Sequence, residues 1–444
     1  MFPGVTLSKA FVALRALSAA ALMLLAMALS PAFAATWFVG PTGTVKGGDG
    51  TEAAPFSSIG GAFGSGRVVG GDTLLLLDGA YGNVEIKGVN PASAVVIKSF
   101  RHRRAQFETV YFAQSSNIVL SGVQIVPKLA VKAPMFLVLG EWNATNITIE
   151  NSSVHAHVNA HNFRQWTAAE WQARASDAIT MRGSGARVIG NSIMGVNFGI
   201  TLNGTDSLAE RNTVNGFNGD GLRGNNDRIT FRANLVTNCV FVGGNHDDGF
   251  QSFNLRTDKR PFDGLVIDRN IFVEWTDAVR GPLACELQGI GMFDGMFSNL
   301  TITTNLVVVS AYHGITVTGA TNVLIANNTV ALPTGIPFSS ARRPWIMVAN
   351  HKDGRQSTGI TIANNVTVGG VLGQPGTIVG NIISTDGAVF RNPATFDFRP
   401  RAGTALVDAA DAALASAVDL TGRKRMSAPD VGAYEAEGRW LRIN

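Results

Sequence analysis

The chain has 444 residues, of which 45% are hydrophobic and only 15% are charged, with 36 Lys and Arg against 32 Asp and Glu. A charge balance this close to neutral argues neither for nor against a nucleic-acid partner, and we expect no such partner. Two cysteines are too few for a zinc site of the usual Cys and His kind and favour a single disulfide.

Residues 1–34 have the features of a secretory signal peptide. Lys9 and Arg15 precede the apolar run "ALSAAALMLLAMAL", and small residues at 32 and 34 favour cleavage after Ala34. No later stretch has 18 consecutive apolar residues, so we expect no membrane span. The sequence therefore predicts an exported protein, either periplasmic or extracellular.

A short phrase centred on asparagine returns along the chain from residue 151 onward, as in "IGNSIM", "ERNTVN", "RANLVT" and "ANNTVA". Successive copies favour a basic coil of roughly 22 residues with insertions in several turns. In stacked coils each asparagine would sit in a tight bend, tolerate the left-handed conformation and bond to the next coil. The repeated positions are Asn151, Asn191, Asn212, Asn234, Asn270, Asn305, Asn328, Asn365 and Asn381.

These repeats predict an all-β fold, a single-stranded right-handed parallel β-helix with an asparagine ladder over residues 75–385. In this pattern the chain resembles pectate lyases and the related polysaccharide lyases, epimerases and hydrolases. Residues 35–74, with "FSSIGGAF", resemble the opening strand and short cap of such enzymes, and residues 386–444 resemble their closing segment. Because this fold supports several chemistries, the resemblance does not identify a reaction.

A second phrase aligns the coils more closely, as in "DAITM", "DGLRG", "DGFQS", "QGIGM" and "HGITV". Equal positions in stacked coils lie one above the other. The first position predicts a column of Asp177, Phe198, Asp220, Asp248, Gln288 and His313. Three residues on, a parallel column of Thr180, Thr201, Arg223, Gln251, Gly291 and Thr316 should face solvent.

The stretch "NHDDGFQS" at 245–252 and the insertions after it supply the candidate site. Carboxylates suit Ca²⁺ and sugar hydroxyls, whereas Arg and Gln suit uronate carboxylates. The predicted calcium ligands are Asp220, Asp247, Asp248 and Glu286. The predicted catalytic residues are Arg223, His246, Asp248, Lys259 and His313. The predicted substrate contacts are Asp177, Gln251, Arg256 and Arg280.

The resemblance and these residues together imply a monomeric lyase that cleaves an acidic, uronate-containing polysaccharide by β-elimination. Arg or Ca²⁺ would neutralise the sugar carboxylate, and Lys259 or His246 would serve as the base. An inverting glycoside hydrolase is the alternative, with Asp220 and the Asp247–Asp248 pair as its carboxylates. A non-catalytic glycan-binding surface protein is a third possibility.

Several of these residues also have structural interpretations. Asp220 could be a bend residue before glycine, and His313 a satisfied structural histidine. Tryptophans such as Trp166 in the insertions more often attach a loop to the body than bind sugar. Cys239 and Cys285 lie shortly before the aligned phrases "DGFQS" and "QGIGM" of neighbouring coils, so we expect their side chains to form a disulfide.

Overall fold

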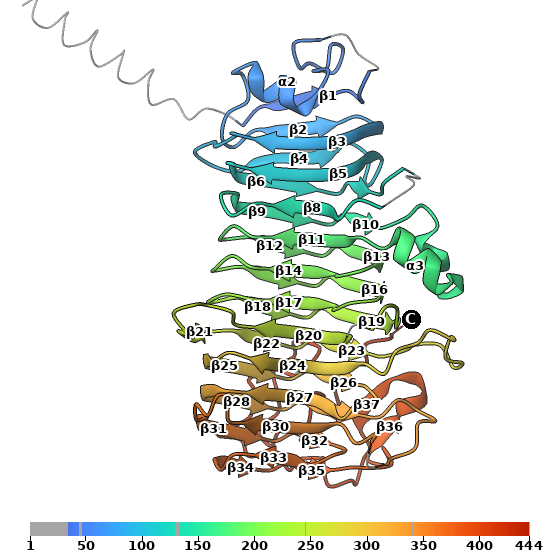
Figure 1. Cartoon of the computed structure of the whole chain (residues 1–444), viewed down its shortest axis with the longest axis vertical. Coiled ribbons are helices and arrows are strands. Elements are labelled where there is room, and N and C mark those ends of the chain that lie inside the picture. Colours follow the sequence, from blue (N-terminus) through green and yellow to red (C-terminus); the bar gives the residue numbers. More distant parts are fainter. Residues whose placement is uncertain (1–33, 44–46, 129–132, 245, 340, 444) are drawn as a thin grey trace, which may run out of the picture.

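The computed structural model describes residues 34–43, 47–128, 133–244, 246–339 and 341–443. The chain winds into a right-handed parallel β-helix whose coils stack along the long axis of the molecule (Figure 1). Almost all of the predicted leader, residues 1–33, lies outside the described residues. Among the residues that are described, no helix combines the length and the apolar character needed to cross a membrane.

Most coils contribute one strand to each of three parallel stacks. The first sheet contains β1 (Thr36–Val39), β2 (Thr73–Leu76), β4 (Val95–Ser99), β6 (Ser116–Ser121), β9 (Thr145–Glu150), β12 (Arg187–Ile189), β15 (Leu208–Glu210), β18 (Thr230–Arg232), β22 (Val266–Asp268), β25 (Phe297–Thr303), β28 (Ala320–Ala326), β31 (Thr358–Ala363) and β34 (Thr377–Val379), with β21 (Phe262–Asp263) paired to β25.

The second stack, here called the ladder stack, follows the asparagine bend of each coil. It contains β7 (Gln124–Ile125), β10 (Ser153–His155), β13 (Ser192–Val196), β16 (Thr213–Phe217), β19 (Leu235–Cys239), β23 (Ile271–Val273), β26 (Leu306–Val308), β29 (Thr329–Ala331), β32 (Val366–Thr367) and β35 (Ile382–Ile383).

The third stack, here called the site stack, carries the predicted functional residues. It contains β3 (Gly79–Lys87), β5 (Ala105–Ala113), β8 (Phe136–Gly140), β11 (Asp177–Met181), β14 (Ile200–Leu202), β17 (Leu222–Gly224), β20 (Asp248–Phe253), β24 (Gln288–Asp294), β27 (His313–Thr318), β30 (Trp345–Ala349) and β33 (Val371–Gly373).

The asparagine ladder is present from Asn191 to Asn381. In each step a backbone N–H and a side-chain Nδ2 donate to the Oδ1 of the next ladder asparagine, as between Asn212 and Asn234 at 3.0 and 2.9 Å. These bonds give partners to backbone N–H groups in the bends, which the hydrogen bonds of the sheets leave unpaired. The ladder therefore ties successive coils together through buried amides.

Two details of the predicted ladder were wrong. Ser152, not Asn151, occupies the ladder position, because its backbone N–H donates to Asn191 Oδ1 at 3.0 Å. The left-handed residue is the one before each ladder asparagine, such as Arg211 at φ 55° and Ala233 at φ 54°. The ladder asparagine keeps an ordinary φ because its role is hydrogen bonding, not turning the chain.

Inward side chains stack in register to form one long core. Along the first sheet a buried column runs through Val188, Ala209, Phe231, Ile267, Ile302, Ile325 and Ile362. Phe231 also meets Phe250 of the site stack edge to face, with ring centroids 5.1 Å apart. Each fully buried aliphatic or aromatic side chain contributes about 1.5–3 kcal/mol relative to exposure.

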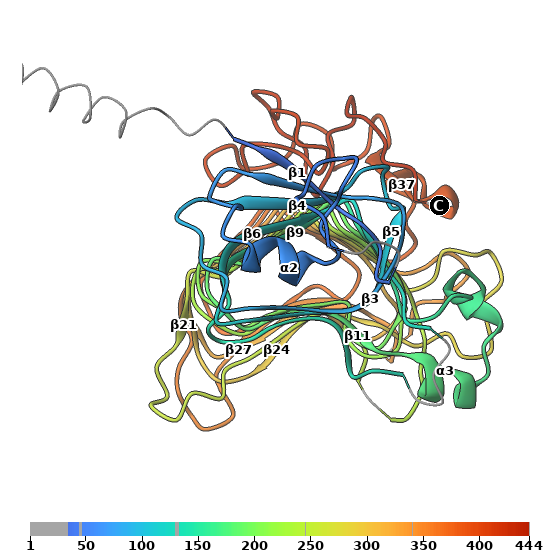
Figure 2. The same ribbon diagram turned by 90° about the horizontal axis from the view of Figure 1, so that it is seen from above.

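The two ends of the solenoid differ. Helix α2 (Ile59–Gly64), capped by the Ser58 hydroxyl, lies over the first coils, and its buried Ile59 and Ala62 join the core (Figure 2). At the other end, Ile378 and Ile383 of the last coil are 48% and 64% exposed. The N-terminal end is therefore covered by a helix, whereas the last coil keeps apolar side chains exposed.

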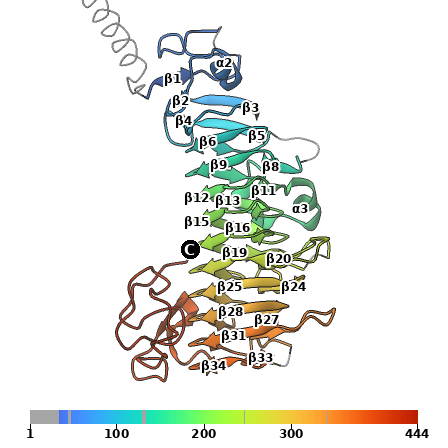
Figure 3. The ribbon, with the colours of Figure 1, turned by 90° about the vertical axis from the view of Figure 1, so that its left-hand side faces the viewer.

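After the last coil the chain turns back along the outside of the lower coils (Figure 3). This segment contains β36 (Phe390–Asn392), the short helix η2 (Pro393–Thr395) and β37 (Asp397–Pro400). Its apolar residues, including Phe398 and Leu406, pack on outward residues of the ladder stack such as Val308. The segment therefore covers outward residues of the ladder stack in the lower coils.

An insertion between β10 and β11 forms the helices η1 (Ala160–Gln165) and α3 (Ala168–Arg174) beside the ladder stack. Its Trp166 and Trp171 are buried with Trp275 from another insertion in one cluster. Cys239 and Cys285 form the expected disulfide, with Cα atoms 5.5 Å apart. The insertion tryptophans thus attach loops to the body, which agrees with their structural interpretation.

Candidate functional site

The site stack brings the predicted columns together in the predicted register. Thr180 pairs with Thr201, Thr201 with Arg223, Arg223 with Gln251, Gln251 with Gly291, and Gly291 with Thr316. Asp248 pairs with Gln288 in the neighbouring column. We call the residues Asp220, Arg223, Asp248, Gln251, Gln288 and His313 the polar strip.

Asp220 and Arg223 form the first rung of the polar strip, on and just before β17. Arg223 Nε donates to Asp220 Oδ2 at 2.5 Å, and the guanidinium lies 3.5 Å from the centroid of the Phe198 ring. Asp220 Oδ1 accepts the backbone N–H of Asp248 at 3.1 Å. Asp220 is therefore a buried carboxyl group that pairs with Arg223 and also accepts a backbone hydrogen bond from the next coil. The second contact agrees with the structural interpretation, and the first allows a functional one.

Asp248 and Gln251 form the next rung, on β20. Gln251 Nε2 donates to Asp248 Oδ2 at 3.1 Å, whereas Asp248 Oδ1 is buried without a hydrogen-bond partner. Oδ1 lies over Gly291 of the following rung, where a Cβ would collide with it. The missing side chain at Gly291 thus makes room for a carboxyl group that has an unsatisfied oxygen.

The two carboxyl groups differ in their electrostatic environment. Burial raises the pKa of Asp248 well above its ordinary value, and the neighbouring Asp220 and Asp247 raise it further. Burial also raises the pKa of Asp220, but the Arg223 guanidinium opposes that rise. Asp248 therefore favours the protonated form, whereas Asp220 has a cation that favours its charged form.

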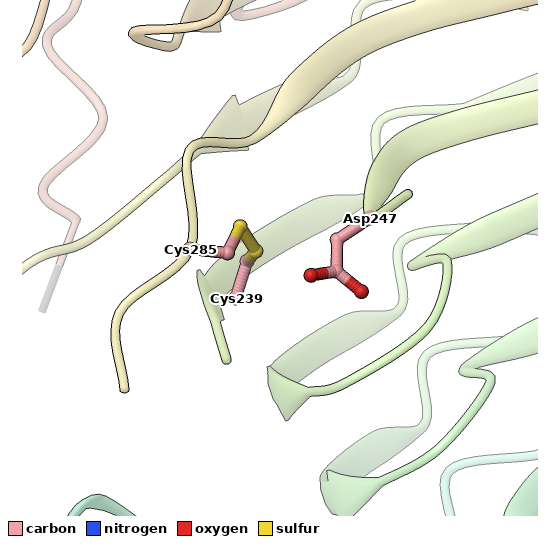
Figure 4. Close-up of side chains that lie close together, drawn as sticks. All are labelled: Cys239, Asp247 and Cys285. Carbon is pink, nitrogen blue, oxygen red and sulfur yellow. A yellow bond between two sulfur atoms is a disulfide. The ribbon is translucent and has the colours of Figure 1, made fainter. Parts of the chain in front are cut away.

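Asp247 faces away from the polar strip. Its carboxyl group lies beside the Cys239–Cys285 disulfide, and it is 4% exposed (Figure 4). Burial, followed by the charge of Asp220, raises the pKa of Asp247 to about 8. The predicted role of Asp247 as a ligand beside Asp248 was wrong in geometry, because Asp247 lies just before β20 and its carboxyl group lies beside the disulfide.

The predicted calcium ligands do not converge. Among the described residues, the one cluster of three Asp, Glu, His or Cys side chains whose ligand atoms all lie within 4.8 Å is Cys239, Asp247 and Cys285. Its two sulfurs are joined in a disulfide and supply no thiolate. Glu286 is exposed and pairs with Arg342 at 2.7 Å. The donor set therefore does not fit a preformed Ca²⁺ site.

His313 lies two rungs beyond Asp248, at the start of β27. Its Nδ1 is 2.9 Å from Thr316 Oγ1, which also accepts the indole N–H of Trp345 at 3.0 Å. Burial lowers the pKa of His313 to about 4, with a smaller contribution from His246. His313 is therefore neutral at physiological pH, while His246 lies exposed just before Asp247.

Three predicted basic residues do not belong to the polar strip. Arg256 donates to both carboxylate oxygens of Asp227 at 2.9 and 3.0 Å. Arg280 pairs with the buried Glu274 and donates to Cys285 O. Lys259 lies in the insertion after β20, whose six residues extend about 16 Å from Asp248 to Phe253, and its backbone carbonyl accepts Arg355 Nη1 at 3.2 Å. The two arginines hold insertions in place, and Lys259 is too distant to act as the base.

Asp177 lies on the flank of the strip, at the start of β11. Its Oδ1 accepts the Nδ2 of Asn197 at 2.8 Å, and burial raises its pKa. Gln288 of the polar strip and the three aromatic residues around His313, namely Phe293, Tyr312 and Trp345, were not predicted as contacts. Gln288 Oε1 is buried without a partner. The coil alignment contained Gln288, but it ended at His313 and therefore missed Trp345.

No family model matches the chain, and no curated protein does. Solved structures share its architecture. The fold is the right-handed parallel β-helix of pectate-lyase-like proteins. Pectate lyase Pel9A is 16% identical, with 90% of this chain and 96% of that chain covered and a TM-score of 0.44.

Two further structures have the same fold. The A-module of the mannuronan C-5 epimerase AlgE6 of Azotobacter vinelandii is 13% identical, with 73% and 93% of the two chains covered and a TM-score of 0.48. The catalytic unit of a GH87 α-1,3-glucanase from Streptomyces thermodiastaticus is 14% identical, with 79% and 69% covered and a TM-score of 0.39. Similarity at this level concerns the fold alone, and the chemistry has to be argued from the polar strip.

Proposed function

We propose that the protein cleaves glycosidic bonds of a polysaccharide along the polar strip. A strip that crosses successive coils suits a linear polymer, and its side chains offer carboxyl, amide and guanidinium groups to sugar hydroxyls. Proteins that share the fold include enzymes named for acting on polysaccharides. The leader-like N-terminus and the disulfide support action outside the cytoplasm.

The observation that carries the proposal is the contrast between Asp248 and Asp220 on adjacent rungs. Asp248, whose pKa is raised well above its ordinary value, can donate a proton to the glycosidic oxygen, and Asp220, where the Arg223 guanidinium opposes the rise in pKa caused by burial, can take a proton from water in its ionised form. Asp248 would be the general acid and Asp220 the general base for hydrolysis. Gln251, which donates to Asp248, is partly exposed, so substrate would displace its side chain to reach this buried carboxyl while Arg223 stays paired with Asp220.

This assignment favours hydrolysis over β-elimination, which the sequence alone favours. β-Elimination on a uronate needs a cation for the sugar carboxylate and a separate base. Lys259 is distant, and Arg256 and Arg280 are bound to other carboxylates. Since the carboxylates do not converge, no step is assigned to Ca²⁺.

β-Elimination remains the second candidate because of two specific groups. Arg223 is the cation of the polar strip and could meet an acidic sugar, with Gln251 beside it. His313 is neutral on the same strip and could accept the α-proton. Asp248 would then protonate the leaving oxygen in this reaction too.

Digestion of polygalacturonate, alginate and a neutral galactan distinguishes the two reactions. Hydrolysis produces new reducing ends without ultraviolet absorbance of an unsaturated sugar, whereas β-elimination produces both. We expect reducing ends alone, at a rate unchanged by a chelator. Unsaturated products would replace hydrolysis with β-elimination, and rate loss on chelation would restore a calcium role.

A further inference from the structure

Beyond the carboxylates, the site stack carries a cluster of rings on the rungs that follow Asp248. Phe293 packs on His313 with centroids 4.8 Å apart, and Tyr312 lies 4.2 Å from His313 and 4.9 Å from Trp345. His313 meets Trp345 edge to face at 5.5 Å. These four side chains, here called the aromatic platform, come from β24, β27, β30 and the residue before β27.

The aromatic platform is continuous with the polar strip. A Cβ placed on Gly291 would touch both Asp248 Oδ1 and the Phe293 ring, so these two groups meet over that glycine. From Phe293 the ring contacts lead through His313 to Tyr312 and Trp345. Two coil spacings, about 10 Å, separate the Asp248 rung from the His313 rung.

The rings of the platform are partly exposed, and two polar side chains beside them have an oxygen without a hydrogen-bond partner. Tyr312 is 44% exposed, and Phe293, His313 and Trp345 are partly exposed. Gln288 Oε1 and Asp248 Oδ1, which lie on the neighbouring rungs, have no hydrogen-bond partner. Rings with unpaired oxygens beside them match a pyranose, which has an apolar face and hydroxyl groups at its rim.

We propose that the aromatic platform is a subsite for the sugar ring next to the scissile bond, on the side of the C-terminal coils. This inference rests on the proposed glycan cleavage and adds which part of the substrate lies toward which end of the polar strip. The ring face would lie on Trp345 and Tyr312, and hydroxyls would reach Gln288. Arg223 at the other end of the strip would leave any acidic sugar to the side of the N-terminal coils.

Binding without cleavage tests the platform. In an Asp248→Asn background, electrophoresis through gels that contain polygalacturonate, alginate or neutral galactan measures retention. Trp345→Ala should weaken binding to the retained polymer about tenfold, the scale of one stacking contact, and Trp345→Phe should weaken it less. Trp142→Ala is the control, because Trp142 is 63% exposed in the turn after β8, the site-stack strand four coils before β20.

Each outcome separates the platform from the proposed function. Equal retention of Trp345→Ala and its parent, or equal loss in Trp142→Ala, overturns the platform and leaves the cleavage proposal intact. Absence of retention in all three gels, together with absence of cleavage by the unmodified protein, overturns both. Loss confined to Trp345→Ala and Tyr312→Ala, with unchanged melting temperatures, supports the platform.

Discussion

Replacement of Asp247 by Asn should change how stability depends on pH. The pKa of Asp247 is about 8 in the folded chain, against an ordinary value of 3.8. Between these values the native state binds a proton that the unfolded state has lost, so the free energy of unfolding falls as pH rises. At 1.36 kcal/mol per unit, this one group costs about 4 kcal/mol between pH 5 and pH 8.

Asp247→Asn removes that pH dependence because the amide does not titrate. Burying an unpaired amide lowers the free energy of unfolding by the same amount at both pH values. The free energy of unfolding of the variant minus that of the parent should therefore rise by about 4 kcal/mol from pH 5 to pH 8. Urea unfolding at the two pH values measures it. Asp258→Asn is the control, since that side chain is 63% exposed. Equal pH slopes for the parent and Asp247→Asn would refute the reasoning.

Three further predictions concern parts of the fold around the site. Lys259→Ala should leave the cleavage rate within about twofold of the parent, because Lys259 lies in the insertion beyond the end of β20 that is opposite to Asp248; a 100-fold loss would return it to the site. Thiol titration of the denatured, unreduced protein should find no free thiol at Cys239 or Cys285, and two free thiols would contradict the disulfide. A chain that starts at Ala35 should melt higher than one with two extra residues before it, because the Ala35 nitrogen lies 2.7 Å from Asp72 Oδ1 and would become a charged donor; equal melting temperatures would contradict this pairing.

Much of the fold could be predicted from the sequence because coils stack in register. The spacing of the asparagines predicts the β-helix, and the aligned phrases predict which residues share a column, as Arg223 and Gln251 do. The position of the left-handed residue was not predictable from the asparagines alone. Several residue types occupy that position, including Arg211 and Ala233, and they leave no common signature.

The site was predictable only where it lies on strands. Asp220, Arg223, Asp248 and Gln251 belong to rungs, and they meet as expected. Residues in insertions were misplaced, because the path of a loop does not follow from the repeat.

Two other features required different information. Asp247 lies just before β20, and the alignment of the coils does not show that its carboxyl group lies beside the Cys239–Cys285 disulfide. Trp345 follows an insertion after β29, so the coil alignment did not extend to it. Its partnership with His313 depends on the pairing of β27 with β30, which only the structure supplies.

The most direct test of the account is the cleavage rate of Asp248→Asn on a polysaccharide that the unmodified protein cleaves. Asn has nearly the shape of Asp and can still accept the Gln251 amide, but it has no proton to give to the glycosidic oxygen. The account predicts at least ~100-fold loss of rate with a melting temperature within a few degrees of the parent. A variant that folds and keeps most of the activity would show that the polar strip is not the active site.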